Sequence, residues 1–356
     1  MRSAKVAECS TVTHANKEAL NIIWPLSQQQ ALFRLRRRLF GLASSLPSTP
    51  HRRVAQLFTL LLGMACSNAY AQDPDAAMRA RWSAEVGVGA EYDTNVSVDE
   101  VDLSSGQSDY AYIIDFELGV KKKLTEKIDA SASYNISQSS YNEFSRVDRR
   151  TQILGGALNR DLGSSNAGLS AYYIDSTLDG DPFLRFARVS PSLSGFLARK
   201  WFARGAYVHS ERRIDGRSQR NASTRSAEAD VYYFHRGLRS YVNLGYRYRD
   251  EDAVAEELDF QSHALKLRYI RRFDIFGRRA KAEAALRYEV RDYRSEEPTI
   301  GEPRDDDRLR FKMDFEVPLN DRLTWQWYYS YGDYVSNLPR ADFTQNILGT
   351  RLQLAW

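Results

Sequence analysis

The stretch that decides the fold is residues 342–356, DFTQNILGTRLQLAW. Leu348, Leu352, Leu354 and Trp356 lie on alternate positions, with Gly349, Arg351, Gln353 and Ala355 between them. Successive side chains of a strand point to opposite faces, so the pattern predicts an amphipathic strand ending on an aromatic residue. A long apolar strand edge invites pairing with other chains. We therefore expect this strand to be paired on both sides, as in a closed sheet.

The composition argues against a helical membrane protein. The 356 residues are 43% hydrophobic and 27% charged, with a mean hydropathy of −0.53. The sequence has no apolar run of eighteen residues, the length that a membrane-spanning helix requires.

One shorter apolar run, VAQLFTLLLGMAC at 54–66, follows the basic residues 51–53 and precedes Ala69 and Ala71. This arrangement predicts a signal peptide over 51–71, cleaved between Ala71 and Gln72. Cys66 raises the alternative of a lipoprotein. The residue three positions before it is Gly63, where lipidation sites carry a branched apolar residue, so we expect an ordinary cleaved signal peptide rather than lipidation at Cys66.

Residues 1–50 fit two interpretations: a basic amphipathic helix at 32–40 (LFRLRRRLF), or an upstream extension from an early start codon, which we favour. Residues 1–71 hold nine of the 50 Lys and Arg, two of the 46 Asp and Glu, and both cysteines. The remaining chain has 41 basic and 44 acidic residues, which gives no support for nucleic-acid binding. It also has no cysteine for disulfides or thiolate metal ligands.

After a short lead at 72–81, residues 82–356 read as amphipathic strands joined by alternating long and short connections. Long polar loops are expected at 97–108, 212–224, 251–257 and 293–307, and Pro191 predicts a bulge or bend because it cannot donate to a ladder. The fourteen expected strands are 82–96, 110–122, 128–142, 148–159, 166–177, 183–199, 201–211, 225–235, 240–250, 258–270, 280–292, 308–317, 323–331 and 342–356.

The fold class that follows is all-β: a transmembrane, antiparallel, up-and-down β-barrel of about fourteen strands. A soluble sandwich would also bury one apolar face. The opposite face here carries dense charge of both signs, as a wet lumen does, and aromatic residues gather at strand ends, where a membrane barrel has its girdles. The girdle residues we predict are Trp82, Trp325, Trp327 and Trp356.

The charged face is the candidate functional region, because fourteen strands enclose a narrow or plugged lumen. Its arginines could form a ladder for anionic solutes or a passing polypeptide, or the charges could only neutralise one another and hold the strands in register. The acidic loops could bind divalent cations or simply be solvated, and we favour solvation. The residues predicted to line the lumen are Asp115, Glu117, Glu228, Asp230, Arg247, Arg249, Arg287, Arg291, Arg308, Arg310, Asp314 and Glu316.

Catalysis has weaker support. His209 precedes Ser210 and His263 follows Ser262, but neighbouring strand residues point to opposite faces, so neither is a nucleophile and base pair by itself. We expect no catalytic residues, no metal site and no cofactor, since no metal-ligand spacing or phosphate loop is present.

The layout also carries a resemblance. The first strand contains GVGAEYDTNV at 87–96 and the chain closes with RLQLAW at 351–356, which resembles the C-terminal barrel of the surface lipoprotein assembly modifier family of Gram-negative bacteria. The resemblance implies a cell outer-membrane location, contact with outer-membrane lipid and lipopolysaccharide, and a C-terminal Trp read by the barrel-assembly machinery. That family carries a periplasmic repeat domain before its barrel, whereas only 72–81 separates the expected cleavage site from the first strand.

We therefore expect an integral outer-membrane barrel that forms a narrow transport or export pathway, for a surface lipoprotein, another polypeptide or a small anionic solute. The alternative is a non-conducting structural or assembly barrel that binds a surface partner. An outer-membrane hydrolase is a third hypothesis.

Overall fold

The structure, a computed structural model, describes residues 79–356. The expected extension (1–50), signal peptide (51–71) and all but the end of the lead (72–81) lie outside these described residues. The long strands are β1 (Arg81–Asp93), β4 (Asp109–Thr125), β5 (Ile128–Tyr141), β6 (Arg149–Asp161), β7 (Ser165–Leu178), β8 (Asp181–Ala198), β9 (Trp201–Ile214), β10 (Ala222–Leu238), β11 (Ser240–Ala253), β12 (Phe260–Ile275), β13 (Arg278–Glu297), β14 (Glu302–Pro318), β15 (Leu323–Ser336) and β16 (Phe343–Ala355).

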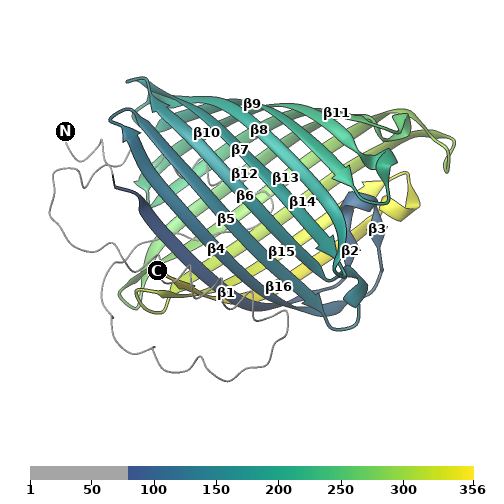
Figure 1. Cartoon of the computed structure of the whole chain (residues 1–356), viewed down its shortest axis with the longest axis horizontal. Helices are drawn as coiled ribbons and strands as arrows, with labels where there is room; N and C mark the ends of the chain where they lie inside the picture. The colour runs from purple at the N-terminus through teal and green to yellow at the C-terminus, as the bar shows by residue number, and fades with distance from the viewer. Residues whose placement is uncertain (1–78) are drawn as a thin grey trace, which may run out of the picture.

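These fourteen strands form one closed barrel, in which each strand pairs with its neighbours in sequence (Figure 1). The barrel closes where β16 pairs with β1 in antiparallel register, Val88 opposite Leu352. At the end of this seam the Trp356 N–H donates to the Ala84 carbonyl at 2.8 Å. The expected double pairing of the last strand is confirmed.

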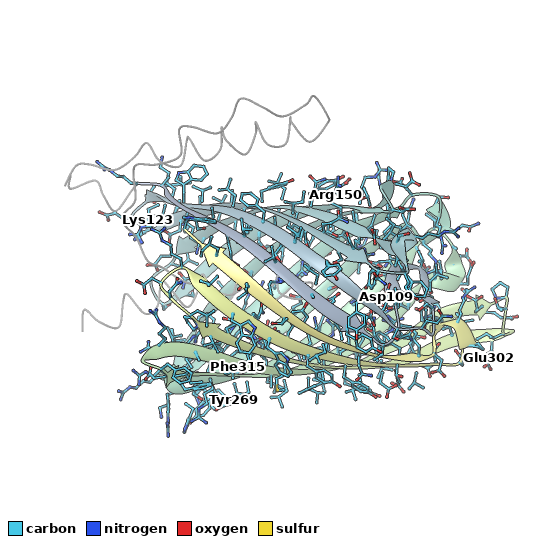
Figure 2. All side chains as sticks on the ribbon, turned by 90° about the horizontal axis from the view of Figure 1, so that it is seen from below. Asp109, Lys123, Arg150, Tyr269, Glu302 and Phe315 are labelled. Carbon is cyan, nitrogen blue, oxygen red and sulfur yellow. The ribbon has the colours of Figure 1, made fainter. Side chains whose placement is uncertain are left out.

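The outer surface is apolar because every second strand residue is apolar and points outward. Tyr110, Tyr112 and Ile114 of β4 are 61%, 66% and 59% exposed, whereas Ala111 and Ile113 between them are buried. Figure 2 shows side chains of this kind covering the outside of the ribbon along its length. Within residues 79–356, no helix has the length and apolarity to cross a membrane.

Several connections differ from expectation. The loop expected at 293–307 is mostly strand, because β13 continues to Glu297 and β14 begins at Glu302. The loops expected at 212–224 and 251–257 are shorter, since β9 ends at Ile214, β10 begins at Ala222 and β11 runs to Ala253. The first strand ends at Asp93 rather than at 96. Most of the extra strand length of β9, β11, β13 and β14 is hydrophilic, which hides its period of two, although Ile214 and Tyr293 are buried.

Pro191 does not shift the register. It lies opposite Leu169 of β7, and β8 pairs with β9 in one unchanged register from Val189 to Ser192. The irregularities of β8 are at its ends, beside Ser176 and Thr177 on β7 and between Phe196 and Ala198. The expected bulge at Pro191 is therefore wrong. The Pro191 side chain points outward. The missing backbone N–H interrupts only the pairing with β9.

The connection between β1 and β4 contains two short strands, β2 (Ser97–Val98) and β3 (Leu103–Ser104), joined by a 3₁₀ turn, η2 (Asp99–Val101). We call residues 97–104 the mouth segment. In Figure 1 it lies at the end of the barrel opposite the C-terminus. Val98 and Val101 are buried against Phe183 of β8 and Ile214 of β9, so the segment packs onto strands far from its own.

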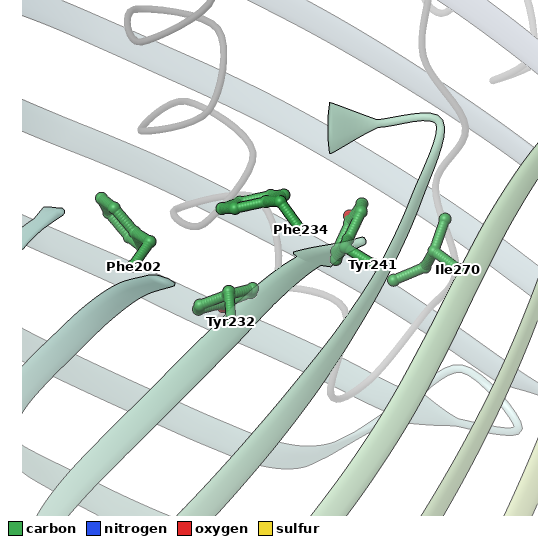
Figure 3. Packing of buried hydrophobic residues seen from close by; sticks show 5 residues of the cluster. All are labelled: Phe202, Tyr232, Phe234, Tyr241 and Ile270. Atoms are coloured by element: carbon green, nitrogen blue, oxygen red, sulfur yellow. The ribbon is translucent and has the colours of Figure 1, made fainter. Parts of the chain in front are cut away.

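A second apolar cluster lies on the inner face near the other end of the barrel. Phe202, Tyr232, Phe234, Tyr241 and Ile270 come from β9 to β12 and pack together (Figure 3). All five are at most 6% exposed. Bulky, mostly aromatic side chains therefore pack against one another on the inner face near this end of β9 to β12.

Candidate functional site: the barrel interior

The two halves of the interior differ in the size and charge of their side chains. The inner positions of β10 to β14 carry mostly Arg, Lys, Asp and Glu, and the cross-strand register places them on one face. The inner positions of β5 to β8 carry mostly small neutral residues. This small-residue wall consists of Ser131, Ser133, Asn135, Ser137, Thr151, Gly155, Ala157, Asn159, Gly168, Ser170, Ser176, Ser190, Ser192 and Ser194.

Solvent reaches part of this small-residue wall from inside the barrel. Ser133, Asn135, Ala157, Ser170 and Ser192 face inward yet are half-buried rather than buried. Nearer the mouth segment, Ser137, Thr151 and Ser176 are only 4%, 7% and 3% exposed. The small-residue wall is therefore less tightly packed toward the end that holds the chain terminus than toward the mouth segment.

Five arginines surround one carboxylate on the charged wall. We call Glu289 of β13 with Arg247, Arg249, Arg287, Arg291 and Arg310 the Glu289 cluster. The guanidinium nitrogens lie 2.7 to 3.7 Å from the Glu289 oxygens. The Glu289 side chain is fully buried, so charges from β11, β13 and β14 converge on it.

Outside the Glu289 cluster, the interior positive and negative side chains are paired in more nearly equal numbers. Arg268 holds both oxygens of Glu283, at 2.5 and 3.1 Å. Lys281 lies 3.1 Å from Glu283 and from Glu316. Across the seam, Arg351 contacts Asp115 at 3.1 Å.

A further group joins β8, β9, β10 and β12. Arg188 and Arg204 contact Glu228 at 3.2 and 3.8 Å, and Arg204 and Lys266 contact Asp230 at 3.6 and 3.0 Å. Arg188 on β8 reaches over β9 to Glu228 on β10, which is possible only on the concave side of the sheet. These pairs both line the interior and tie strands together.

The mouth segment crosses the barrel opening. On one side Asp102 contacts Arg304 of β14 at 3.0 Å, and Arg220, beside β9, at 2.8 Å. On the other side Glu100 accepts from Arg149 of β6 at 2.8 Å. The apolar contacts to β8 and β9 complete the bridge. Strands on several sides of the barrel thus hold the segment over the interior.

The charge of Asp102 is maintained by its partners. Burial by itself would raise the pKa of this carboxyl, but hydrogen bonds and positive charge from Arg304 and Arg220 outweigh burial and hold the pKa well below its usual range. Asp102 is therefore ionised at neutral and mildly acidic pH, when its ion pairs keep the mouth segment in place.

The residues predicted for the lumen lie on the inner face. Asp115, Asp230, Arg308, Asp314 and Glu316 are buried, and the other seven are half-buried. The structure gathers all six predicted arginines around Glu289 or Asp306 and separates Asp115 and Glu117, which lie on β4. Their part in transport stays a prediction.

Four residues of these charge clusters were not among the predicted site residues: Glu289, Asp102, Arg304 and Arg220. Glu289 could have been found, because Arg287 and Arg291 flank it at the same strand period. The other three lie in or near connections, and nothing in the local pattern marks them.

The outer face holds the tryptophans and histidines. Trp82, Trp325 and Trp356 are 60%, 38% and 54% exposed near the terminal end, and Trp327 is half-buried beside them. Their role as a girdle stays a prediction. His209 points outward to Glu211, while the neighbouring Ser210 is buried inside. His263 likewise contacts Tyr246 outside, while Ser262 is fully buried. No group of three potential metal ligands occurs within residues 79–356.

No protein-family model matches the chain, and no curated protein matches it. Solved structures do. A loop-deleted form of OmpT, an outer-membrane protein of Vibrio cholerae, aligns at 8% identity and a TM-score of 0.46, covering 79% of this chain and 100% of that one. The anion-selective porin from Comamonas acidovorans aligns at 10% identity and 0.44, covering 78% and 99%.

A bacterial polysaccharide outer membrane secretin aligns at 12% identity and a TM-score of 0.39, covering 77% of this chain and 97% of that one. At these identities and scores the likeness concerns barrel architecture, and what any of these proteins transports does not carry over.

Proposed function

We propose that this barrel spans the outer membrane and forms a narrow pathway for solutes, closed at one end by the mouth segment. The apolar outer face of a closed sheet supports the membrane location, because a lumen-facing polar surface and a lipid-facing apolar one alternate along each strand. The observation that carries the pathway is the half-exposed small-residue wall, since side chains that face inward meet solvent only through the interior.

The charged wall gives the pathway its selectivity. Arginines from β11, β13 and β14 face the small neutral residues, so a solute in the interior passes fixed positive charge. Small anions are the solutes that this arrangement favours.

Planar-bilayer conductance of the folded full-length chain tests the pathway. We expect small currents carried mainly by anions, with anion preference reduced in the double variant Arg308→Gln and Arg310→Gln. The matched control is Arg268→Gln, because Arg268 is paired with both oxygens of Glu283. Absence of any current at neutral and at low pH would overturn the proposal.

The mouth segment favours a second candidate, a non-conducting barrel whose loops bind a surface partner. Its ion pairs and apolar contacts make the closed end a rigid surface. Photo-crosslinking from the β13–β14 turn, 298–301, in intact cells would capture one recurrent partner under this function and none under the first.

Delivery of a lipoprotein or another polypeptide is the finer form of the export function that the family resemblance implies. An extended polypeptide would need the mouth segment to leave the opening. Exposure of a surface lipoprotein to added protease, compared between cells with and without the barrel, tests this form directly.

A further inference from the structure

The Glu289 cluster carries more positive charge than its carboxylate can balance. Arg287 and Arg291 donate hydrogen bonds to Glu289 at 2.7 and 3.2 Å. Arg249, Arg247 and Arg310 lie at 3.4, 3.5 and 3.7 Å, as ion pairs without hydrogen bonds. Arg249 also lies 3.7 Å from Glu251, whereas the other four guanidinium groups share the single buried carboxylate of Glu289.

Donors of this cluster lack acceptors. Within residues 79–356, Arg247 Nε and Nη2 and Arg287 Nε are buried without a hydrogen-bond partner. Leaving a buried charged donor without an acceptor is unfavourable, because the group has lost water and gained nothing in exchange. By contrast, Glu283 accepts from Arg268 through both oxygens, and Lys281 lies between two carboxylates.

The chemistry of these donors selects the ligand. A guanidinium group is a planar fork that binds carboxylate or phosphate oxygens through two parallel hydrogen bonds. The excess of positive charge favours a ligand with more than one negative charge and several oxygens. Arg310 is the most exposed member of the cluster, with 29% of its side chain accessible, and offers the first contact.

We propose that the Glu289 cluster is a binding site for a multivalent oxyanion, either inorganic phosphate or a phosphate monoester. The proposal deepens the anion pathway and rests on it for its role in transport, although binding itself needs no current. Glu289 then competes with the ligand for the same arginines and keeps the affinity low enough for release.

Calorimetric titration of the folded full-length chain in detergent micelles tests the site, with inorganic phosphate and glycerol phosphate as separate probes. We expect Arg247→Gln to weaken phosphate binding by about tenfold, the loss typical of one charged hydrogen-bond partner. Glu289→Gln should strengthen binding, because it removes the competing carboxylate. Arg268→Gln, which alters a balanced pair on the same wall, should leave binding unchanged.

Arg247→Gln and Glu289→Gln should change the phosphate affinity in opposite directions. This difference separates an effect on binding from damage to the fold, since a destabilised barrel cannot bind phosphate more tightly. Added phosphate should also raise the unfolding temperature of Glu289→Gln more than that of the parent chain, by linkage. If Glu289→Gln does not fold, the phosphate affinities of Arg247→Gln and Arg268→Gln are compared, and that comparison decides whether the cluster binds phosphate.

No phosphate binding by the parent chain, or equal losses in Arg247→Gln and Arg268→Gln, would overturn the site. Preferential binding of glycerol phosphate would identify a phosphate monoester as the ligand, and equal binding would identify the phosphate group alone. Phosphate binding without current would leave the site standing while the pathway fails. Current without phosphate binding would support the pathway and overturn the phosphate site.

Discussion

At the scale of single residues, Gly349 shows how the barrel seam is fastened. A Cβ atom at Gly349 would lie 2.2 Å from Cζ of Tyr328, so only glycine lets this ring rest on β16. The Tyr328 hydroxyl then reaches Glu91 of β1 at 2.9 Å, from β15 and across the closing strand. We expect Gly349→Ala to lower the free energy of unfolding by about 1–3 kcal/mol, the usual cost of overpacking. Urea unfolding in micelles measures it.

Gly205→Ala is the matched control, because a Cβ atom there meets nothing within 4 Å in the described structure. Tyr328→Phe should lose less than Gly349→Ala, since it removes the hydrogen bond but keeps the ring. Equal stabilities of Gly349→Ala and Gly205→Ala would show that the ring does not depend on this glycine.

Residue patterns predicted which side chains face inward but not which of them meet. Arg287, Glu289 and Arg291 share a face because they are two residues apart, and that follows from the sequence. Their contacts with Arg247 and Arg310 depend on the register of four strands, β11 to β14. Asp102 illustrates the limit, since its partner Arg304 is 202 residues away and neither lies in an amphipathic pattern.

At the scale of elements, the mouth segment should respond to acid. Because the folded pKa of Asp102 is depressed, its ion pairs contribute stability that is fully present above the ordinary carboxyl pKa near 3.9. That contribution is lost as the pH falls from there through the folded pKa. We expect conductance to be low and constant from about pH 5 to 7 and to rise below about pH 4.

Asp102→Asn removes the charge at every pH, so its conductance at pH 7 should exceed that of the parent chain and change less with acid. Asp215→Asn is a control at another loop, where the carboxylate pairs with the exposed Arg185. If Asp102→Asn conducts like the parent chain at pH 7, these ion pairs do not close the opening.

Element boundaries were predicted well where the outer face of the strand is apolar and poorly beyond it. The β14 core, Arg308 to Val317, alternates charged and apolar residues and was found with its face correctly assigned. Its continuation from Glu302 to Asp307 is polar on both faces, because that end carries no apolar outer band. The sequence pattern therefore predicts a loop there. Strand length outside the apolar band is fixed by pairing between β13 and β14, which a single-strand pattern does not contain.

At the scale of the whole molecule, the even strand number and the closing strand were predictable, while the asymmetry of the interior was not. The alternation along each strand predicts its own inner residues, and the small residues of β5 to β8 can be read from the sequence. That these strands form one continuous wall, with arginines from β11, β13 and β14 inside the same barrel, depends on closure. Closure therefore decides whether there is an interior at all.

A disulfide across the seam tests closure. Val88 of β1 lies opposite Leu352 of β16, and both side chains are exposed on the outer face. Directly opposed strand residues have Cα atoms about 4.5–5.5 Å apart, within the range that a disulfide spans. In a chain with Cys9 and Cys66 replaced by serine, we expect Val88→Cys with Leu352→Cys to lose both free thiols on mild oxidation. The denatured product should then migrate faster, because the bond encloses nearly the whole barrel.

Val88→Cys with Leu244→Cys is the matched pair on β1 and β11, which are not neighbours in the barrel. It should keep both thiols under the same conditions. Free thiols in the seam pair, or equal oxidation of the two pairs, would show that β1 and β16 are not joined. The interior would then not be enclosed. The Glu289 cluster and the mouth segment would not be buried in the way that a closed barrel requires.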